Sequence, residues 1–168
     1  MSYTAAIITV SDKGFAGERV DKSGPAVREI LERDGWVILS ETTVPDDFER
    51  IKAELVRCSY ALNACLIITT GGTGFSRRDV TPEATEAVIN RVVPGIPEAM
   101  RAASTKLTPR GMLSRGTAGL RGETLIVNLP GSETAARENL EAVTAALKHG
   151  VDMLRGTKSD CAEAFSNG

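Results

Sequence analysis

Residues 63–85 read NACLIITTGGTGFSRRDVTPEAT, an apolar run followed by a glycine-rich turn and then by charged residues. Because the apolar positions are consecutive, both faces of the strand that they predict are expected to be buried. Strands buried on both faces are typical of parallel sheets that are covered by helices on each side. The stretch therefore predicts an interior strand of a parallel sheet, with a glycine turn where that strand ends.

Strands and helices are predicted to alternate along the rest of the chain, because β-branched apolar runs alternate with amphipathic segments. This alternation predicts an α/β fold, a three-layer α/β/α sandwich with a mostly parallel sheet. Residues 1–168 are expected to form a single domain with its core at about residues 4–150, and the tail from residue 159 is expected to be frayed. Strands are predicted at residues 4–10, 36–44, 63–70 and 123–130, helices at 26–35 (starting near Ser23 and Pro25), 47–60, 81–92, 97–107 and 131–150, and irregular structure at 108–122.

Polar and glycine-rich segments follow each predicted strand. They comprise residues 11–24, 44–47, 71–79 and 129–132. The carboxyl ends of parallel strands lie at one edge of a sheet, and ligands of open α/β sheets bind beyond that edge. We therefore expect the four segments to form one binding site.

The composition argues against several classes of protein. A formal net charge of -2 and an aromatic content of 4% are unfavourable for a protein whose main role is nucleic-acid binding. No apolar run approaches the roughly 20 residues of a membrane-spanning helix. The start, MSYTAAIITVSD, lacks the basic segment of a secretory signal, so a cytoplasmic location without membrane contact is expected.

The cysteines and the single histidine indicate no redox or metal motif. Cys58, Cys65 and Cys161 match no zinc or disulfide spacing and are interpreted as reduced thiols. His149 precedes Gly150 and is placed in the last turn of a helix, where a basic residue favours the helix dipole. One histidine also excludes a histidine-rich metal site.

The glycine turn, residues 71–74, favours contact with an anion. Glycine has no Cβ and tolerates positive φ, so successive amides can approach a phosphate. The turn lacks the Gly-Lys-Ser/Thr ending of a P-loop. A merely tight turn is the alternative. If the turn faces a phosphate, a Cβ added at Gly72 is expected to obstruct the bound anion.

Two acidic residues at neighbouring strand ends suggest a magnesium site. Asp46 and Asp79 each supply a carboxylate, and Mg²⁺ in proteins takes one or two carboxylates together with substrate phosphates. A helix cap is the alternative for Asp46. At Asp79 the expected cap is Thr81, with Pro82 at the first helical position, which leaves Asp79 free for another role.

Other charged and small residues in these loops have two interpretations each. Arg77 and Arg78 are either phosphate ligands or solvated charges. Ser132 is either a helix cap or part of a second anion site. The loop at residues 112–119 is basic and long enough to suggest a function.

Six segments occur in the order found in the molybdopterin adenylyltransferase family, which the chain resembles from about residue 4 to residue 150. That family includes bacterial molybdenum-cofactor biosynthesis proteins and the G domain of gephyrin. The segments are ITVSD at 8–12, VPDDFERI at 44–51, TTGGTGFSRRDVTPEAT at 69–85, PGIPEAMR at 94–101, MLSRGTAGLRG at 112–122 and LIVNLPGS at 125–132. One departure is Glu133, where many relatives have proline.

The resemblance implies Mg²⁺-dependent transfer of AMP from ATP to molybdopterin, with release of pyrophosphate. It implies catalytic and metal-binding roles for Asp46 and Asp79. It further implies substrate contacts from Ser11, Asp12, Gly71, Gly72, Thr73, Gly74, Ser104, Ser114, Arg115, Pro130, Gly131 and Ser132. A homotrimer is implied, and a molybdate-inserting enzyme as a possible partner.

Three other functions are compatible with the resemblance. They are a molybdopterin-binding protein without catalysis, a scaffold such as gephyrin, and the molybdate-inserting relative. The intact RRDVTPEAT and VPDD segments favour the enzyme, because the non-catalytic branches lack the aspartates. Whether molybdenum or tungsten is served stays open at this point.

Overall fold

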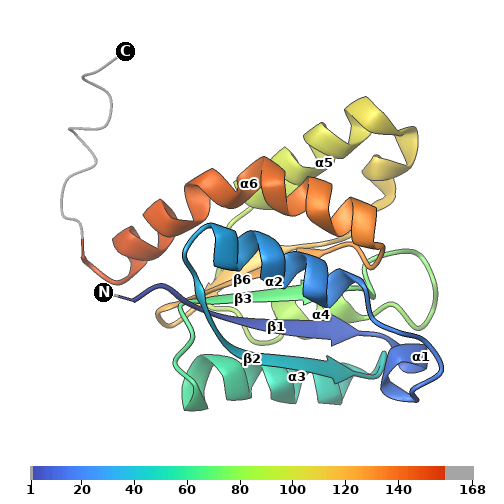
Figure 1. The fold of residues 1–168 in the computed structure, drawn as a ribbon, viewed down its shortest axis with the longest axis horizontal. Helices are drawn as coiled ribbons and strands as arrows, with labels where there is room; N and C mark the ends of the chain where they lie inside the picture. The colour runs from blue at the N-terminus through green and yellow to red at the C-terminus, as the bar shows by residue number, and fades with distance from the viewer. Residues whose placement is uncertain (1, 158–168) are drawn as a thin grey trace.

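A computed structural model describes residues 2–157 and contains a six-stranded sheet in the order β2-β1-β3-β6-β5-β4 (Figure 1). The first four strands in that order are parallel, and β5 and β4 are antiparallel to their neighbours. The predicted α/β fold with a mostly parallel sheet is confirmed. The strands are β1 (Thr4–Val10), β2 (Val37–Val44), β3 (Leu66–Thr70), β4 (Arg91–Val92), β5 (Ala118–Arg121) and β6 (Thr124–Leu129).

Helices cover both faces of the sheet (Figure 1). Alternate residues of β1 enter opposite cores, because side chains of a strand point to alternate faces. Ile7 packs with the core under α2, α5 and α6, and Ile8 with the core over α3 and α4. The helices are α1 (Asp12–Phe15), α2 (Ser23–Arg33), α3 (Phe48–Val56), α4 (Thr81–Glu86), α5 (Gly95–Leu107) and α6 (Glu133–Leu154), with a π-helical turn at Arg57–Ala61 and a 3-10 helix at Pro109–Leu113.

β3 is the central strand that its sequence predicts. All five of its residues are buried, and it pairs with β1 on one side and β6 on the other. Its last residue, Thr70, leads directly into the glycine turn. The interior strand and the glycine turn that residues 63–85 predict are therefore both confirmed.

The predicted start of α2 near Ser23 is confirmed, and the predicted cap of α4 is wrong. Helix α2 begins at Ser23 with Lys22 as cap residue, and the Asp21 carboxylate accepts hydrogen bonds from the amides of Ser23 and Gly24. Thr81 is already helical and does not cap α4, since its hydroxyl donates to the carbonyl of Gly71. At Thr81, a tertiary hydrogen bond uses the hydroxyl group that a local rule would assign to the cap.

Three predicted segment ends also change. The helix that was expected to reach residue 92 ends at Glu86, and the irregular segment 108–122 contains a 3-10 helix and β5. Helix α6 continues past Gly150 to Leu154, so His149 is not in its last turn. Core contacts of Val151 and Leu147 favour this continuation, and they outweigh the low helix propensity of one glycine.

The thiols that the structure describes fit the interpretation as structural residues. Cys58 and Cys65 are free and buried, and burial raises the pKa of the Cys58 thiol to about 12. Cys161 and the tail predicted to be frayed lie outside the described residues. Within residues 2–157, none of the helices combines the length and the apolar character needed to cross a bilayer.

Candidate active site

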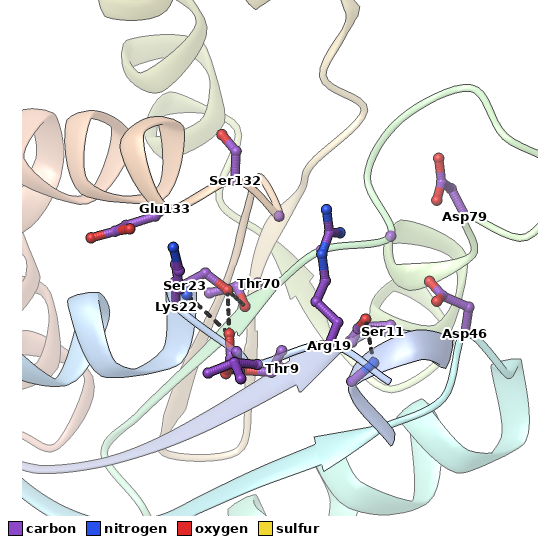
Figure 2. Close-up of a pocket in the computed structure, with 17 residues that line it drawn as sticks. Thr9, Ser11, Arg19, Lys22, Ser23, Asp46, Thr70, Asp79, Ser132 and Glu133 are labelled. Atoms are coloured by element: carbon purple, nitrogen blue, oxygen red, sulfur yellow. Dashed lines mark hydrogen bonds between the residues drawn. The ribbon is translucent and has the colours of Figure 1, made fainter. Parts of the chain in front are cut away.

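The four segments that follow the parallel strands meet at one edge of the sheet and line a cavity of about 640 Å³, here called the large cavity. The predicted clustering is therefore confirmed. Ser11, Asp46, Gly72 and Ser132 each come from a different segment and all line this cavity. Figure 2 labels Ser11, Asp46 and Ser132 around it.

A second cavity of about 420 Å³, the small cavity, adjoins the large one. Three residues, Gly72, Asp79 and Gly131, line both cavities, so the two spaces share a wall. The small cavity is also lined by Thr73 and Gly74 of the glycine turn, by Pro130, and by residues of α5, of the 3-10 helix with its flanking residues, and of the first turns of α6. The last group includes Ser104, Arg110, Ser114 and Asn139.

The glycine turn owes its composition to the protein around it. Gly71 and Gly72 have φ values of +97° and +65°, which side chains other than glycine rarely adopt. A Cβ at Gly71 would lie 2.3 Å from the carbonyl oxygen of Val10, and one at Gly72 would lie 2.3 Å from Oγ1 of Thr81. The missing Cβ of Gly72 thus makes room for Thr81, and obstruction of a bound anion by an added Cβ stays a prediction.

The backbone amides of the glycine turn remain suited to an anion. Among residues 2–157, the amides of Gly72, Thr73 and Gly74 have no hydrogen-bond acceptor. Thr81 holds the turn from behind, because its amide donates to the carbonyl of Gly72 at 3.1 Å and its hydroxyl donates to that of Gly71 at 2.9 Å. Three consecutive unpaired amides on a fixed turn supply the donors that an anion-binding nest needs.

Asp12 holds Asp46 through a reciprocal pair of hydrogen bonds. The amide of Asp12 donates to Oδ2 of Asp46 at 2.8 Å, and the amide of Asp46 donates to Oδ1 of Asp12 at 2.9 Å. The Arg78 guanidinium donates to both oxygens of Asp12, at 2.9 and 3.0 Å. Asp12 lines neither cavity, so a role in positioning Asp46 fits the structure better than the predicted substrate contact.

Asp46 and Asp79 lie on the same side of the large cavity (Figure 2). Burial raises the pKa of Asp46, and the negative charges of Asp12 and Asp79 raise it further. The hydrogen bond from Arg78 lowers the pKa of Asp12. The next residue, Asp47, caps α3 by accepting from the amide of Arg50, so the capping alternative applies to Asp47 and leaves Asp46 free.

The two carboxylates fit a magnesium ion. Asp46 uses Oδ2 for Asp12, and Asp79 uses Oδ2 for the amide of Ser76 at 3.0 Å. Within the described chain, the Oδ1 atom of each has no hydrogen-bond donor, which leaves one oxygen per carboxylate for a cation. Residues 2–157 contain no cluster of three or more acidic, histidine or cysteine ligands, and Mg²⁺ with substrate phosphates needs only one or two.

Arg115 stabilises the glycine turn and lines neither cavity. Its guanidinium donates to the carbonyl oxygens of Gly74 and Asp79 and forms an ion pair with Glu83. These contacts occupy the guanidinium group for which the family resemblance implies a substrate contact. Ser104 and Ser114 do line the small cavity, and Ser104 accepts a hydrogen bond from Asn139 at 2.9 Å.

The turn at residues 130–132 lies opposite the glycine turn in the wall between the two cavities. Ser132 caps α6 by accepting from the amide of Ala135, as the sequence indicates. A Cβ at Gly131 would approach Cα of Gly71 to 3.1 Å, so the two turns pack backbone to backbone. Glu133 lines the large cavity at the first turn of α6.

Several residues of the site are not identified by the sequence analysis. Thr9, Asp21, Ser23 and Thr70 form a hydrogen-bonded group on the floor of the large cavity. Arg19 and Lys22 line the same cavity. For Arg19 and Lys22, the only signal in the sequence is their place in the loop between the first strand and the helix that starts near Ser23.

Comparisons with known proteins agree with the geometry. Residues 6–149 match the profile of a family described as "Probable molybdopterin binding domain". The molybdopterin adenylyltransferase of Helicobacter pylori (strain ATCC 700392 / 26695) is 39% identical over 155 residues, which cover 89% of this chain and 86% of that protein. Gephyrin of Dictyostelium discoideum is 39% identical over 162 residues, which cover 90% of this chain but only 22% of the gephyrin.

A solved structure supports the same assignment. MoaB, a molybdopterin biosynthesis enzyme of Thermus thermophilus, is 46% identical and superposes with a TM-score of 0.88. The match covers 92% of this chain and 97% of that one. The similarity therefore extends over nearly the whole chain in both sequence and fold.

Proposed function

This chain belongs to the molybdopterin-binding domain family, and from that membership we propose that it is a molybdopterin adenylyltransferase, an enzyme that transfers AMP from ATP to molybdopterin. The relatives with that name match the chain over most of their length, which supports an enzyme of molybdenum-cofactor biosynthesis.

The observation that carries the proposal is the pair of cavities with a shared wall. Adenylyl transfer joins two substrates, so it requires two adjacent binding spaces that meet at the reacting phosphorus. Gly72, Asp79 and Gly131 lie at that junction. The unpaired amides of the glycine turn would hold phosphate oxygens there.

ATP is assigned to the large cavity and molybdopterin to the small one. The large cavity contains both carboxylates that fit Mg²⁺, together with the cations Arg19 and Lys22, as a triphosphate requires. The small cavity offers hydroxyl and amide groups of Ser104, Ser114 and Asn139, which can pair with the polar edge of a pterin.

The reaction is balanced as a single displacement. A phosphate oxygen of molybdopterin attacks the α-phosphorus of ATP and forms a new P–O bond. The bond from that phosphorus to the oxygen bridging to the β-phosphorus breaks, and its electron pair leaves with pyrophosphate. Bound Mg²⁺ would neutralise phosphate charge during this exchange.

The residues of this chain contribute position and charge to that displacement. Asp46 and Asp79 would hold the cation through their free oxygens, and the amides of residues 72–74 would orient the phosphate at the wall. Preorganised donors of this kind stabilise developing charge, so the absence of a histidine or cysteine nucleophile in the site does not count against the mechanism.

The direct test is incubation of the protein with molybdopterin, ATP and Mg²⁺, followed by detection of adenylyl-molybdopterin and pyrophosphate. Formation of both products supports the enzyme. Tight binding of molybdopterin without either product would favour the non-catalytic binding protein instead. The free carboxylate oxygens of Asp46 and Asp79 favour the first outcome.

Assembly and location extend the proposal. A homotrimer in the cytoplasm is proposed on the family resemblance, with the molybdate-inserting enzyme as the partner that receives the adenylate. Sedimentation equilibrium tests the trimer, and a pull-down with the inserting enzyme in the presence of product tests the partner.

A further inference from the structure

The segment between α1 and α2 brings two cations into the large cavity. Arg19 and Lys22 both line it, and within residues 2–157 neither is in an ion pair. Figure 2 shows the Arg19 side chain extending into the cavity between Lys22 on one side and the Asp46–Asp79 pair on the other.

Two arginines near this edge, Arg78 and Arg115, are already engaged. Arg78 is paired with Asp12, and Arg115 is paired with Glu83. Neither of these two arginines lines the large cavity. Arg19 and Lys22 are therefore the cationic side chains that the described chain presents to the large cavity.

The backbone on either side of the two cations is anchored. The amide of Arg19 donates to the carbonyl of Lys13 at 3.2 Å, which closes the turn after α1. Asp21, next to Lys22, accepts hydrogen bonds from Thr9 and from Ser23. The two side chains thus project from a fixed segment, so an anion that they bind would meet a preorganised pair.

We propose that Arg19 and Lys22 bind the β- and γ-phosphates of ATP and hold the pyrophosphate that leaves. This inference rests on the proposed adenylyl transfer. The negative charge that leaves the α-phosphorus appears on pyrophosphate, and cations fixed beside the departing group stabilise that charge. Arginine also pairs with two phosphate oxygens at once, which suits a diphosphate.

The neighbouring charges indicate which of the two cations, Arg19 or Lys22, contributes more to phosphate binding. Glu133 lines the large cavity on the side toward which Lys22 points (Figure 2), and it lies 3.6 Å from Arg137. Its negative charge offsets part of the field of Lys22. Arg19 extends away from Glu133 into the middle of the cavity, so Arg19 is expected to contribute more to phosphate binding.

The test compares three ligands by titration calorimetry with Mg²⁺ present: pyrophosphate, ATP and AMP. Charged hydrogen bonds contribute about 1.5–3 kcal/mol, so Arg19→Gln should weaken pyrophosphate and ATP about tenfold or more, and Lys22→Gln should weaken them less. Affinity for AMP, which lacks both outer phosphates, should stay within about twofold. Arg91→Gln removes one charge on β4 at the far edge of the sheet and should change none of the three affinities.

Folding is a separate control. Both side chains are exposed and make no side-chain hydrogen bond within the described chain, so the variants should keep the unfolding midpoint of the unmodified protein. Arg19→Lys keeps the charge and should retain most of the affinity for pyrophosphate. That retention would show that charge rather than a loop rearrangement is responsible.

Two results with the variants would overturn the inference: unchanged pyrophosphate affinity in both glutamine variants, or an equal loss of affinity for AMP and ATP. Failure of the unmodified protein to bind pyrophosphate would do the same. The transferase assay stands apart from these measurements. Pyrophosphate bound through Arg19 in a protein that makes no adenylate would contradict the proposed reaction and leave the phosphate-binding role intact.

Discussion

At the residue scale, the two oxygens of the Asp79 carboxylate have different roles. One oxygen accepts the amide of Ser76, and within residues 2–157 the other has no donor. Asp79→Asn keeps an acceptor for Ser76 but loses the charge that would hold Mg²⁺. The variant should fold normally and lose roughly 10²–10³ in the rate of adenylyl transfer. Steady-state kinetics with circular dichroism measure both, and a near-normal rate would remove Asp79 from the catalytic set.

Asp46 and its neighbour Asp47 provide a matched pair. Asp46→Ala should lower turnover or raise the Mg²⁺ requirement, because it removes a cavity carboxylate. Asp47→Ala should leave turnover unchanged and cost about 1 kcal/mol of stability, since it removes the cap of α3. Magnesium titrations and urea unfolding separate the two effects. If turnover falls in Asp47→Ala but not in Asp46→Ala, the catalytic carboxylate is Asp47 rather than Asp46.

Asp12 should act through Asp46 rather than on substrate. Asp12→Ala removes the acceptor for the amide of Asp46 and should raise the Mg²⁺ concentration that gives half-maximal rate, with little change in affinity for molybdopterin. Arg78→Gln removes the ion pair with Asp12 but keeps that hydrogen bond, so it should have a smaller effect. A large loss of molybdopterin affinity in Asp12→Ala would instead favour direct contact with substrate.

The glycine turn is explained at the scale of elements, because its shape is set by β1 and α4. Gly71 passes close to the last carbonyl of β1, and Gly72 packs against Thr81 at the start of α4. A glycine-rich turn and an anion site are therefore compatible interpretations. The backbone conformation that the neighbouring elements require also leaves three amides without acceptors among the described residues.

Gly72→Ala tests that account against a matched glycine. Both Gly72 and Gly122 have positive φ, but a Cβ at Gly122 meets nothing within 4 Å, whereas one at Gly72 meets Thr81. Gly122→Ala should cost about 1 kcal/mol of stability from backbone strain alone. Gly72→Ala should cost more and should also displace Asp46, whose Oδ1 would lie 3.3 Å from the new Cβ. If chemical unfolding shows the same loss of stability in both variants, Thr81 moves away from the new Cβ without a measurable cost.

At the scale of the whole molecule, the site joins segments from four strand ends, so substrate should stabilise the entire fold. A ligand at about one hundred times its Kd adds about 2.7 kcal/mol, which is on the order of 5–10 °C in Tm for a domain of this size. ATP with Mg²⁺ should therefore raise the Tm, and ATP with chelator should raise it less. In Asp79→Asn, the rise in Tm with ATP and Mg²⁺ should be close to the rise with ATP and chelator. Identical shifts in the unmodified protein with and without Mg²⁺ would contradict a role for the cation in nucleotide binding.

The sequence by itself determined the class of fold and the edge where the site lies. Consecutive apolar residues in β3 require burial on both faces, and the loops after parallel strands must meet at one edge. It also indicated Asp46 and Asp79, because each carboxylate follows a predicted strand and because the family resemblance implies catalytic roles for both. Those inferences depend on period and order along the chain, which are local properties.

Only the tertiary structure decided which side chains are free to act. Thr81 has a cap-like sequence context, yet its hydroxyl is used by Gly71, ten residues away along the chain. Arg115 resembles a ligand, yet its guanidinium is used by Gly74, Asp79 and Glu83. Arg19 and Lys22 resemble ordinary loop charges, yet within residues 2–157 they remain unpaired in the large cavity. A hydrogen bond or ion pair between distant residues leaves no trace in local sequence, because it depends on where the packed sheet and helices bring the two groups.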